Sequence, residues 1–357
     1  MDATPGLDSL DQADLTAPVR QATGRPTLEV VDWECSSIHI PFNWATGGVY
    51  RVMGTGRDGD ELVRWSMILK VAQYPVRSHI GTVDPTDYNY WKREAILYQS
   101  GLLDNLQGLQ AARSFGVVER SDTSAWLWLE DVHDPMGSRW PLERYRVAAH
   151  HLGQFNGAYL HKWAMPDLPC FTRDFLRSFM TAWAPWMARL PDVRDHPYVT
   201  RSCPATLLKR ILGLWSEKEH MLTALDRLPR TFCHLDAFPR NLLVRTGPGG
   251  VEETVAVDWA FTGIAPIGAD LAPMVAASVW FFDAAPDQMA EIDSLVFDGY
   301  VEGLRAAGWH GDTRVIRFGY VASAALRYGL FALLSTRQRK RGMEIMQRAA
   351  DRWSTRP

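Results

Sequence analysis

The stretch Thr231–Asp258, TFCHLDAFPRNLLVRTGPGGVEETVAVD, decides the fold of this chain. Its two apolar, strand-forming runs flank a Gly-Pro-Gly-Gly turn, which is the pattern of a β-hairpin. Polar residues stand at the loop ends of this hairpin: Asp236 and Asn241 precede the first run, and Asp258 follows the second. We therefore expect these three side chains to converge on one point, although they span 23 positions.

This combination of residues suits phosphoryl transfer. The reaction needs a carboxylate that orients the attacking hydroxyl and accepts its proton, and it needs hard oxygen ligands that hold Mg²⁺ against the phosphates. Asp236 can supply the first function, and Asn241 with Asp258 the second. In isolation, aspartate and asparagine at such positions are more often loop-capping residues. Their fixed spacing at strand ends favours the catalytic interpretation.

The stretch resembles the aminoglycoside phosphotransferase family, the small-molecule branch of the protein-kinase-like fold. The family pattern is His-Gly-Asp-x-x-x-x-Asn, a strand pair, Ile-Asp-Trp and a later Asp-Leu; this chain has His234-Leu-Asp236, Asn241, Val257-Asp258-Trp259 and Asp270-Leu271. The resemblance implies that Asp236 acts on the acceptor, that His234 supports the loop and that Asp270 holds the loop by hydrogen bonds. Leu235 stands where the family has glycine, a departure that concerns the tightness of the loop and no reacting group. Arg240 is interpreted either as a contact to a phosphate oxygen or as a surface arginine.

Together with this resemblance, the order of patterns along the chain predicts two lobes. Residues 1–24, rich in Asp, Gly, Pro and Thr, are expected to be a disordered acidic tail. Alternating apolar runs predict a β lobe over residues 25–130, and helical spacing predicts a helical lobe over residues 131–357 with the catalytic loop, metal site and acceptor pocket. The expected fold class is α+β, a protein-kinase-like fold whose small antiparallel N-terminal sheet carries one helix.

Two glycine-rich segments compete for the role of phosphate loop. Gly54–Gly59 matches GxGxxG and follows a strand, but it opens no helix, which a dinucleotide site requires. Its Asp-Gly step suits a hairpin turn instead. Thr46, Gly47 and Gly48 are expected to form the turn between the first two strands, where small residues let backbone N–H groups approach a triphosphate. They resemble a shortened form of the family's Gly-Gly-x-x-Asn-x-Val-Tyr-Arg-Val.

Further nucleotide contacts are expected from a lysine and from the lobe boundary. Lys70 ends an apolar strand, where a buried lysine needs a partner. The resemblance implies that it contacts the α- and β-phosphates of ATP and pairs with Glu94 of a predicted helix; the alternatives are a lysine that snorkels to water and a solvated glutamate. The resemblance also places the lobe hinge, whose main chain bonds adenine, at Leu129, Glu130 and Asp131.

Composition excludes several classes of protein. The chain has 357 residues, 46% hydrophobic and 22% charged, with a net charge of −3, as in ordinary globular proteins. No long basic block supports nucleic-acid binding, and no apolar run approaches the roughly 20 residues of a membrane span. The four cysteines are scattered without metal-ligand spacing, and the start lacks the pattern of a signal peptide. We expect a cytoplasmic protein that contacts no membrane.

These observations predict a kinase that uses ATP and Mg²⁺ to phosphorylate a hydroxyl of a small molecule: an antibiotic, a sugar or an amino alcohol. The region expected to bind the acceptor, residues 160–230 together with the C-terminal helices, is not especially acidic, which disfavours a polycationic acceptor. Its tryptophans suit a flatter acceptor or simply form core. Two alternatives remain: a kinase-like nucleotide-binding protein with little or no activity, and a hydrolase or structural helical protein in which the motif is incidental.

Overall fold

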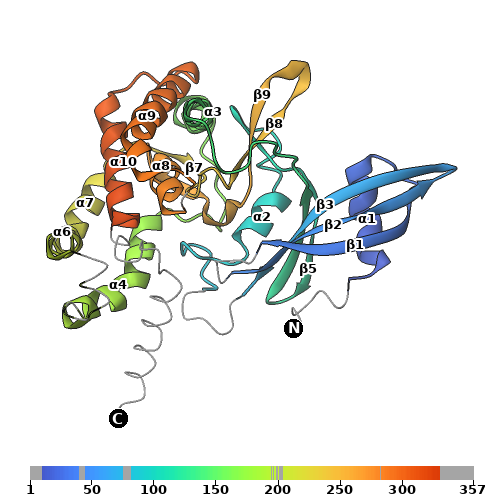
Figure 1. Ribbon diagram of the computed structural model, residues 1–357, viewed down its shortest axis with the longest axis horizontal. Coiled ribbons are helices and arrows are strands. Elements are labelled where there is room, and N and C mark those ends of the chain that lie inside the picture. The colour runs from blue at the N-terminus through green and yellow to red at the C-terminus, as the bar shows by residue number, and fades with distance from the viewer. Residues whose placement is uncertain are drawn as a thin grey trace, which may run out of the picture.

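The computed structural model describes residues 10–39, 45–74, 82–193, 195, 197, 200, 204–281 and 283–329. Figure 1 shows a sheet-containing lobe on the right and a helical lobe on the left. The expected α+β division into a β-rich N-terminal lobe and a helical C-terminal lobe is confirmed. The part of the predicted helical lobe beyond residue 329 lies outside the described residues.

The N-terminal lobe is built on one antiparallel sheet. Its strands are β1 (Glu29–His39), β2 (Thr46–Asp58), β3 (Glu61–Gln73), β5 (Ser114–Ser121) and β6 (Ser124–Glu130), in the order β1-β2-β3-β6-β5. Strands β2 and β3 form a long hairpin that closes from Asp58 to Glu61. Gly59 in this turn has a φ of +61°, which favours glycine. The GxGxxG match therefore belongs to a hairpin, as the Asp-Gly step predicted.

The prediction of a disordered tail over residues 1–24 was wrong for its described part. Helix α1 (Gln12–Thr23) packs against the sheet (Figure 1), so the N-terminal lobe carries two helices instead of one. Asp11 caps its first turn in a capping box with Asp14. Leu15 and Val19, one turn apart, are fully buried in the same apolar cluster as the strand residues. This i, i+4 apolar pair outweighs the polar composition of the segment.

The second helix of the lobe, α2 (Arg93–Gln99), lies between the sheet and the C-terminal lobe (Figure 1). The short strand β4 (Leu109–Ala111) follows it and pairs in parallel with a strand of the C-terminal lobe. Glu94 in the first turn of α2 is buried, so it faces the interior between the lobes.

The C-terminal lobe is mostly helical. It contains α3 (Leu142–His161), α4 (Phe175–Val193), α6 (Ala205–Ser216), α7 (Lys218–Leu225), α8 (Leu271–Trp280), α9 (Met289–Ala306) and α10 (Thr313–Arg327), with strands β7 (Arg230–Cys233), β8 (Leu242–Thr246), β9 (Glu252–Ala256) and β10 (Gly263–Pro266) and the 3-10 turns η1 (Pro248–Gly250), η2 (Trp259–Phe261) and η3 (Pro286–Gln288). The hairpin predicted from the sequence is β8–β9, with Leu242 opposite Ala256. In the described part of the chain, no helix combines the length and apolarity needed to cross a membrane.

The largest apolar cluster joins the two lobes. It contains Leu97 of α2, Leu127 of β6, Phe155 of α3 and Trp259 of η2, all buried. Because one core connects the sheet, α2 and the C-terminal helices, the residues at the lobe boundary are held in fixed positions relative to each other. The candidate site residues Asn241 and Asp258 lie next to members of this core, Leu242 and Trp259.

Candidate active site

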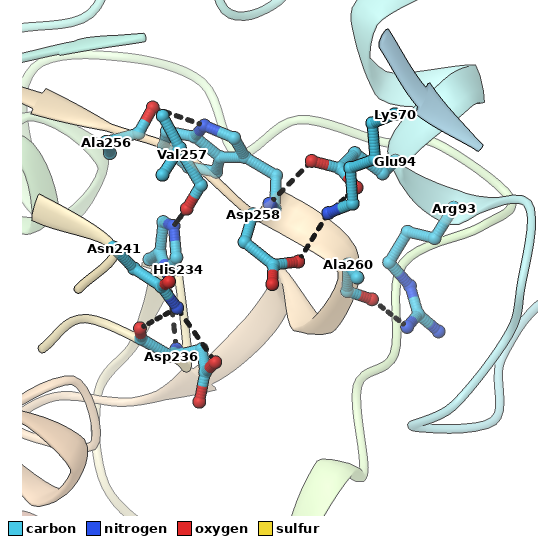
Figure 2. Close-up of polar contacts among 11 residues, drawn as sticks. Lys70, Arg93, Glu94, His234, Asp236, Asn241, Ala256, Val257, Asp258 and Ala260 are labelled. Carbon is cyan, nitrogen blue, oxygen red and sulfur yellow. Dashed lines mark hydrogen bonds and ion pairs between the residues drawn. The ribbon is translucent and has the colours of Figure 1, made fainter. Parts of the chain in front are cut away.

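Asp236 and Asn241, predicted to converge, are in direct contact. The Asn241 Nδ2 group donates to the Asp236 main-chain oxygen at 3.0 Å and to Oδ2 at 2.9 Å. The hairpin brings Asp258 to the same place, because the Val257 amide donates to Asn241 O at 2.9 Å. Figure 2 shows the three residues side by side, with Asp258 on the side of the N-terminal lobe. The sequence spacing therefore predicted the cluster correctly.

Both ring nitrogens of His234 are hydrogen-bonded to the main chain around this loop. Its Nδ1 accepts from the Asp236 amide at 3.2 Å, which leaves Nε2 to donate to Val257 O at 3.0 Å. Its ring packs against Trp259, with centroids 4.5 Å apart. Burial lowers the pKa of His234 to about 4, so the imidazole is neutral at physiological pH. A neutral ring with both nitrogens occupied is a support, as the resemblance implied.

The Asp270 carboxylate holds the same loop by hydrogen bonds to its main chain. Asp270 is fully buried, and its carboxylate accepts from the main-chain amides of His234 at 3.1 Å and Leu235 at 2.6 Å. The Asn156 side chain donates to the Asp270 carboxylate at 3.1 Å. Burial raises the pKa of Asp270 above its ordinary value. The loop-holding hydrogen bonds that the resemblance implied for Asp270 are present.

Leu235, the residue that replaces the family's glycine, has a left-handed backbone. Its φ is +63°, and its side chain is only 3% exposed. A residue with a β-carbon is strained in this region by about 1–2 kcal/mol. The loop therefore keeps the conformation that glycine would favour, because the bond to Asp270 and the burial of the leucine side chain compensate for the strain.

Lys70 pairs with two carboxylates at the boundary of the lobes. Its Nζ lies 2.5 Å from Glu94 Oε2 and 2.7 Å from Asp258 Oδ1. Figure 2 shows Lys70 between these residues, and the other Glu94 oxygen accepts from the Trp259 amide at 3.1 Å. The Lys70–Glu94 pairing is thus present, and Asp258 joins it. This one ammonium group connects β3, α2 and the loop that carries Asp258.

The charges in this cluster stabilise one another. Burial alone would lower the pKa of Lys70, but Asp258 and Glu94 outweigh it and hold the pKa above its ordinary value. The Lys70 ammonium likewise holds the pKa of Asp258 below its ordinary value, against the partial desolvation of this half-exposed carboxylate. Both groups are therefore charged at neutral pH. A lysine held by two carboxylates remains a fixed positive charge at the boundary of the lobes.

Asp236 has a second partner that the sequence did not indicate. Arg327 Nη2, at the end of α10, donates to Asp236 Oδ1 at 2.8 Å, and Nη1 donates to the Leu235 carbonyl. Burial raises the pKa of Asp236 to about 6, although Arg327 opposes the shift. The Asp258 carboxylate adds to the increase. Asp236 is therefore ionised at neutral pH and basic enough to accept a proton.

The residues fit a hard divalent cation such as Mg²⁺. Asn241 donates through Nδ2 to Asp236, which orients its oxygen Oδ1, the atom able to bind a metal, away from that bond. Asp258 uses Oδ1 for Lys70, and its side chain is 41% exposed, so Oδ2 is open to a ligand. One amide oxygen and one carboxylate oxygen suit Mg²⁺, which keeps several waters and binds phosphates as well.

Thr46, Gly47 and Gly48 begin strand β2 instead of forming the expected turn. They run beside the end of β3, with Gly48 opposite Val71, the residue after Lys70. A β-carbon at Gly48 would meet the end of the Tyr50 ring, so a larger residue would require that side chain to shift. The pairing shifts register between Thr46 and Gly48, an irregularity that redirects the backbone here. The preceding residues 40–44 lie outside the described part of the chain.

The three expected hinge residues have different surroundings. Leu129 is buried within β6, opposite Ile68. The Glu130 amide donates to Arg113 O at 2.8 Å, so this N–H is already engaged. The Asp131 carboxylate binds Arg51 of β2 at 2.8 and 3.0 Å. These contacts fix the segment between the lobes and leave the Glu130 amide unsuited to an adenine contact.

Arg240 is engaged away from the expected phosphate position. Its guanidinium pairs with Asp283 at 2.8 and 3.0 Å, donates to Phe281 O at 3.0 Å and lies over the Phe281 ring. The Asp283 side chain is buried and also accepts from Ser138 at 2.8 Å. The catalytic interpretation of Arg240 is therefore not supported; the alternative of a surface arginine agrees better with these contacts.

Two further residues that organise the site were missed from the sequence. Arg93 is fully buried beside Glu94 and donates to the carbonyls of Cys170 at 2.6 Å, Tyr88 at 2.9 Å and Ala260 at 2.8 Å (Figure 2). It thereby connects α2 with the C-terminal lobe and with the turn that follows Asp258. Asn156, in the middle of α3, is the other; its only signal was a polar residue on an otherwise apolar helix face.

Comparison with known proteins gives a family and a fold. The model of the phosphotransferase enzyme family (APH) matches residues 107–309, a span that contains Asp236, Asn241 and Asp258 but neither Lys70 nor Glu94. No curated protein sequence matches the chain. Among solved structures, a microcompartment-associated aminopropanol kinase is similar with a TM-score of 0.52 and 14% identity, covering 93% of each chain.

Two further solved structures are similar at lower scores. An amicoumacin kinase has a TM-score of 0.49 and 13% identity, covering 88% of this chain and 86% of that one. An aminoglycoside phosphotransferase from Streptomyces rimosus has a TM-score of 0.45 and 18% identity, covering 88% of this chain and 99% of that one. At such identities the likeness concerns the fold alone. The expected protein-kinase-like fold is confirmed.

Proposed function

Because the chain belongs to the phosphotransferase enzyme family, we propose that it is an ATP-dependent kinase that phosphorylates a hydroxyl group of a small molecule. The observation that carries this proposal is the convergence of the Asp236–Asn241 pair with the Lys70–Glu94–Asp258 cluster. A base, two oxygen ligands for a metal and a phosphate-binding lysine are the parts that phosphoryl transfer uses. Their assembly from four separate segments is not explained by loop capping.

Asp236 acts on the acceptor. Its Oδ2 is oriented by Asn241 and its Oδ1 by Arg327, so the carboxylate has one orientation. In that orientation it receives the proton of the acceptor hydroxyl and directs the oxygen for in-line attack. The pKa of about 6 makes it a stronger base than an exposed aspartate while leaving it ionised at neutral pH. His234 contributes by fixing the loop.

The nucleotide lies between the lobes. Lys70 faces the α- and β-phosphates, the backbone of Thr46–Gly48 covers them, and the segment after β6 contacts adenine. Asn241 Oδ1 and Asp258 Oδ2 would hold Mg²⁺, which would supply positive charge against the phosphate oxygens. Glu94 keeps Lys70 in place. Since Lys70 is already held by Glu94 and Asp258 without ligand, the phosphate site is largely assembled before ATP binds.

The competing interpretation is a kinase-like protein that binds nucleotide with little or no turnover. It would be favoured by loss of the base, the lysine or a metal ligand. All of these residues are present and in contact, which favours the active enzyme. The acceptor belongs to the class of small alcohols; antibiotics, sugars and amino alcohols are the candidates.

The test is ADP release with Mg²⁺-ATP against a panel of hydroxylated acceptors, comparing wild type with Asp236→Asn. We expect acceptor-stimulated release that Asp236→Asn reduces by about 10²–10⁴-fold, the range of general-base catalysis, with ATP binding retained. Asp293→Asn is the matched control, because Asp293 pairs with Arg317 on the protein surface away from the site. Near-normal turnover by Asp236→Asn would refute the assigned role, and absence of Mg²⁺-dependent ATP binding would refute the function.

A further inference from the structure

Arg327 lies directly against the carboxylate that faces the acceptor. It is the last residue of α10, and its side chain is 11% exposed. One nitrogen donates to Asp236 Oδ1 at 2.8 Å, and the other terminal nitrogen donates to the carbonyl of Leu235. An acceptor hydroxyl that approaches Asp236 therefore also approaches a guanidinium group.

The guanidinium is held from several sides. It lies 5.0 Å from the ring centroid of Phe175, 5.4 Å from that of Phe261 and 5.1 Å from that of Tyr328. Cation–π contacts with three rings and hydrogen bonds to two oxygens restrict its movement. A lysine could carry the same charge but could not make this planar set of contacts. Arg327 is therefore a fixed positive charge beside the acceptor position.

We propose that Arg327 determines which acceptors the site takes: it favours a hydroxyl next to a neutral or anionic group and disfavours a hydroxyl next to an ammonium group. This inference rests on the proposed function, because it concerns the acceptor half of the same site. The Asp236–Arg327 pair has no net charge, so Asp236 does not attract a cationic acceptor by itself. A neighbouring ammonium group would meet the guanidinium at short range, where like charges repel strongly in a partly buried site.

A cavity with a largely apolar wall adjoins Arg327. It has a volume of about 40 Å³, and Leu235, Arg327 and Ser323 are among the residues that line it. Four arginines and two aspartates contribute to its wall: Arg173, Arg177, Arg230, Arg327, Asp174 and Asp226. The wall thus has no surplus of carboxylates that would recognise ammonium groups. The cavity is large enough for a water molecule or a small substituent.

Ser323 adds a polar group to this cavity. It lies one turn before Arg327 on α10 and is only 3% exposed. Among the described residues, its hydroxyl has no hydrogen-bond partner. A buried hydroxyl without a partner is costly unless a ligand or water supplies one. A neutral or anionic substituent with oxygen atoms could accept hydrogen bonds from both Ser323 and Arg327.

The experiment compares acceptors that share a hydroxyl but differ in charge. Two matched sets serve as probes: glucuronate, glucose and glucosamine; and 4-hydroxybutyrate, 1,4-butanediol and 4-amino-1-butanol. ADP release with Mg²⁺-ATP gives kcat/KM for each, in wild type, Arg327→Gln and Arg327→Lys. Arg317→Gln is the control, because Arg317 lies on the same helix and pairs with Asp293 at 2.8 Å, remote from Asp236.

In wild type, we expect kcat/KM for the amine to be at least tenfold below that for its neutral or anionic counterpart. The ratio of kcat/KM for the neutral or anionic acceptor to kcat/KM for the amine should fall at least tenfold in Arg327→Gln. Turnover should fall for all acceptors as well, because Asp236 loses a partner. Arg327→Lys should keep the ratio, and Arg317→Gln should keep both ratio and rate. A wild-type preference for the amines, or an equal loss for every acceptor in Arg327→Gln, would overturn the proposal and leave Arg327 with a positioning role only.

Failure of the proposed function gives a different result. It would show as no binding of Mg²⁺-ATP in calorimetry and no ADP release with any acceptor of either set. The wild-type calorimetric titration therefore separates the two failures before any variant is compared.

Discussion

Leu235 provides a test of how the loop before Asp236 is stabilised. Replacement by alanine removes a side chain that is 97% buried from the cluster around α4 and α10, which should cost about 2–5 kcal/mol of unfolding free energy. Replacement by glycine removes the same side chain but also relieves the left-handed strain of about 1–2 kcal/mol. Glycine loses about 0.5–1 kcal/mol through the greater freedom of the unfolded chain. Leu235→Gly should therefore be more stable than Leu235→Ala by about 0.5–1 kcal/mol.

The assay is guanidinium unfolding followed by tryptophan fluorescence, with the dependence on denaturant compared between variants. Leu152 of α3 is the control position, because it is fully buried and helical. There, glycine should be less stable than alanine by about 1 kcal/mol. If Leu235→Gly is also less stable than Leu235→Ala by that amount, the left-handed backbone stores no strain and the reasoning fails.

Two further outcomes follow from the buried polar groups. Asp270→Asn leaves one oxygen for the amides of His234 and Leu235, so the free energy of unfolding should fall by about 2–4 kcal/mol. The kcat should also fall, with little change in KM for ATP. A change in KM for ATP without a lower kcat would contradict the loop-holding role. His151, whose pKa is lowered to about 4 by burial and by Arg144, is neutral when folded but protonates near pH 6.5 when unfolded, so stability should fall as pH drops from 6.5 towards 4. Between pH 7 and pH 5, the free energy of unfolding of wild type should fall by about 1 kcal/mol relative to that of His151→Gln, after discounting for the partial exposure of the ring. Denaturant unfolding at each pH measures this. A difference between the two proteins that does not change with pH would contradict the prediction.

The parts of the site that the sequence predicted correctly depend on short-range patterns. The β8–β9 hairpin follows from two apolar runs around a glycine-rich turn, and it alone brings Asn241 and the segment of Asp258 together. A lysine at the end of a buried strand needs a partner, and the resemblance to the family named Glu94 as that partner. The disordered tail was predicted wrongly, since the composition of α1 hid the apolar pair that anchors it.

Residue types and spacing by themselves determined the hairpin and the proposed set of base, metal ligands and lysine, and together with the family resemblance they predicted the class of fold. They did so because hydrogen bonding within a hairpin and the periodicity of buried residues are local properties. Only the tertiary structure decided the partners of these groups. Arg327 contacts Asp236, 91 positions away in the sequence, and Arg93 contacts Ala260, 167 positions away. No local sequence pattern predicts either contact. Long-range packing selects such partners, and here it sets both the charge beside the base and the conformation of the loop that carries it.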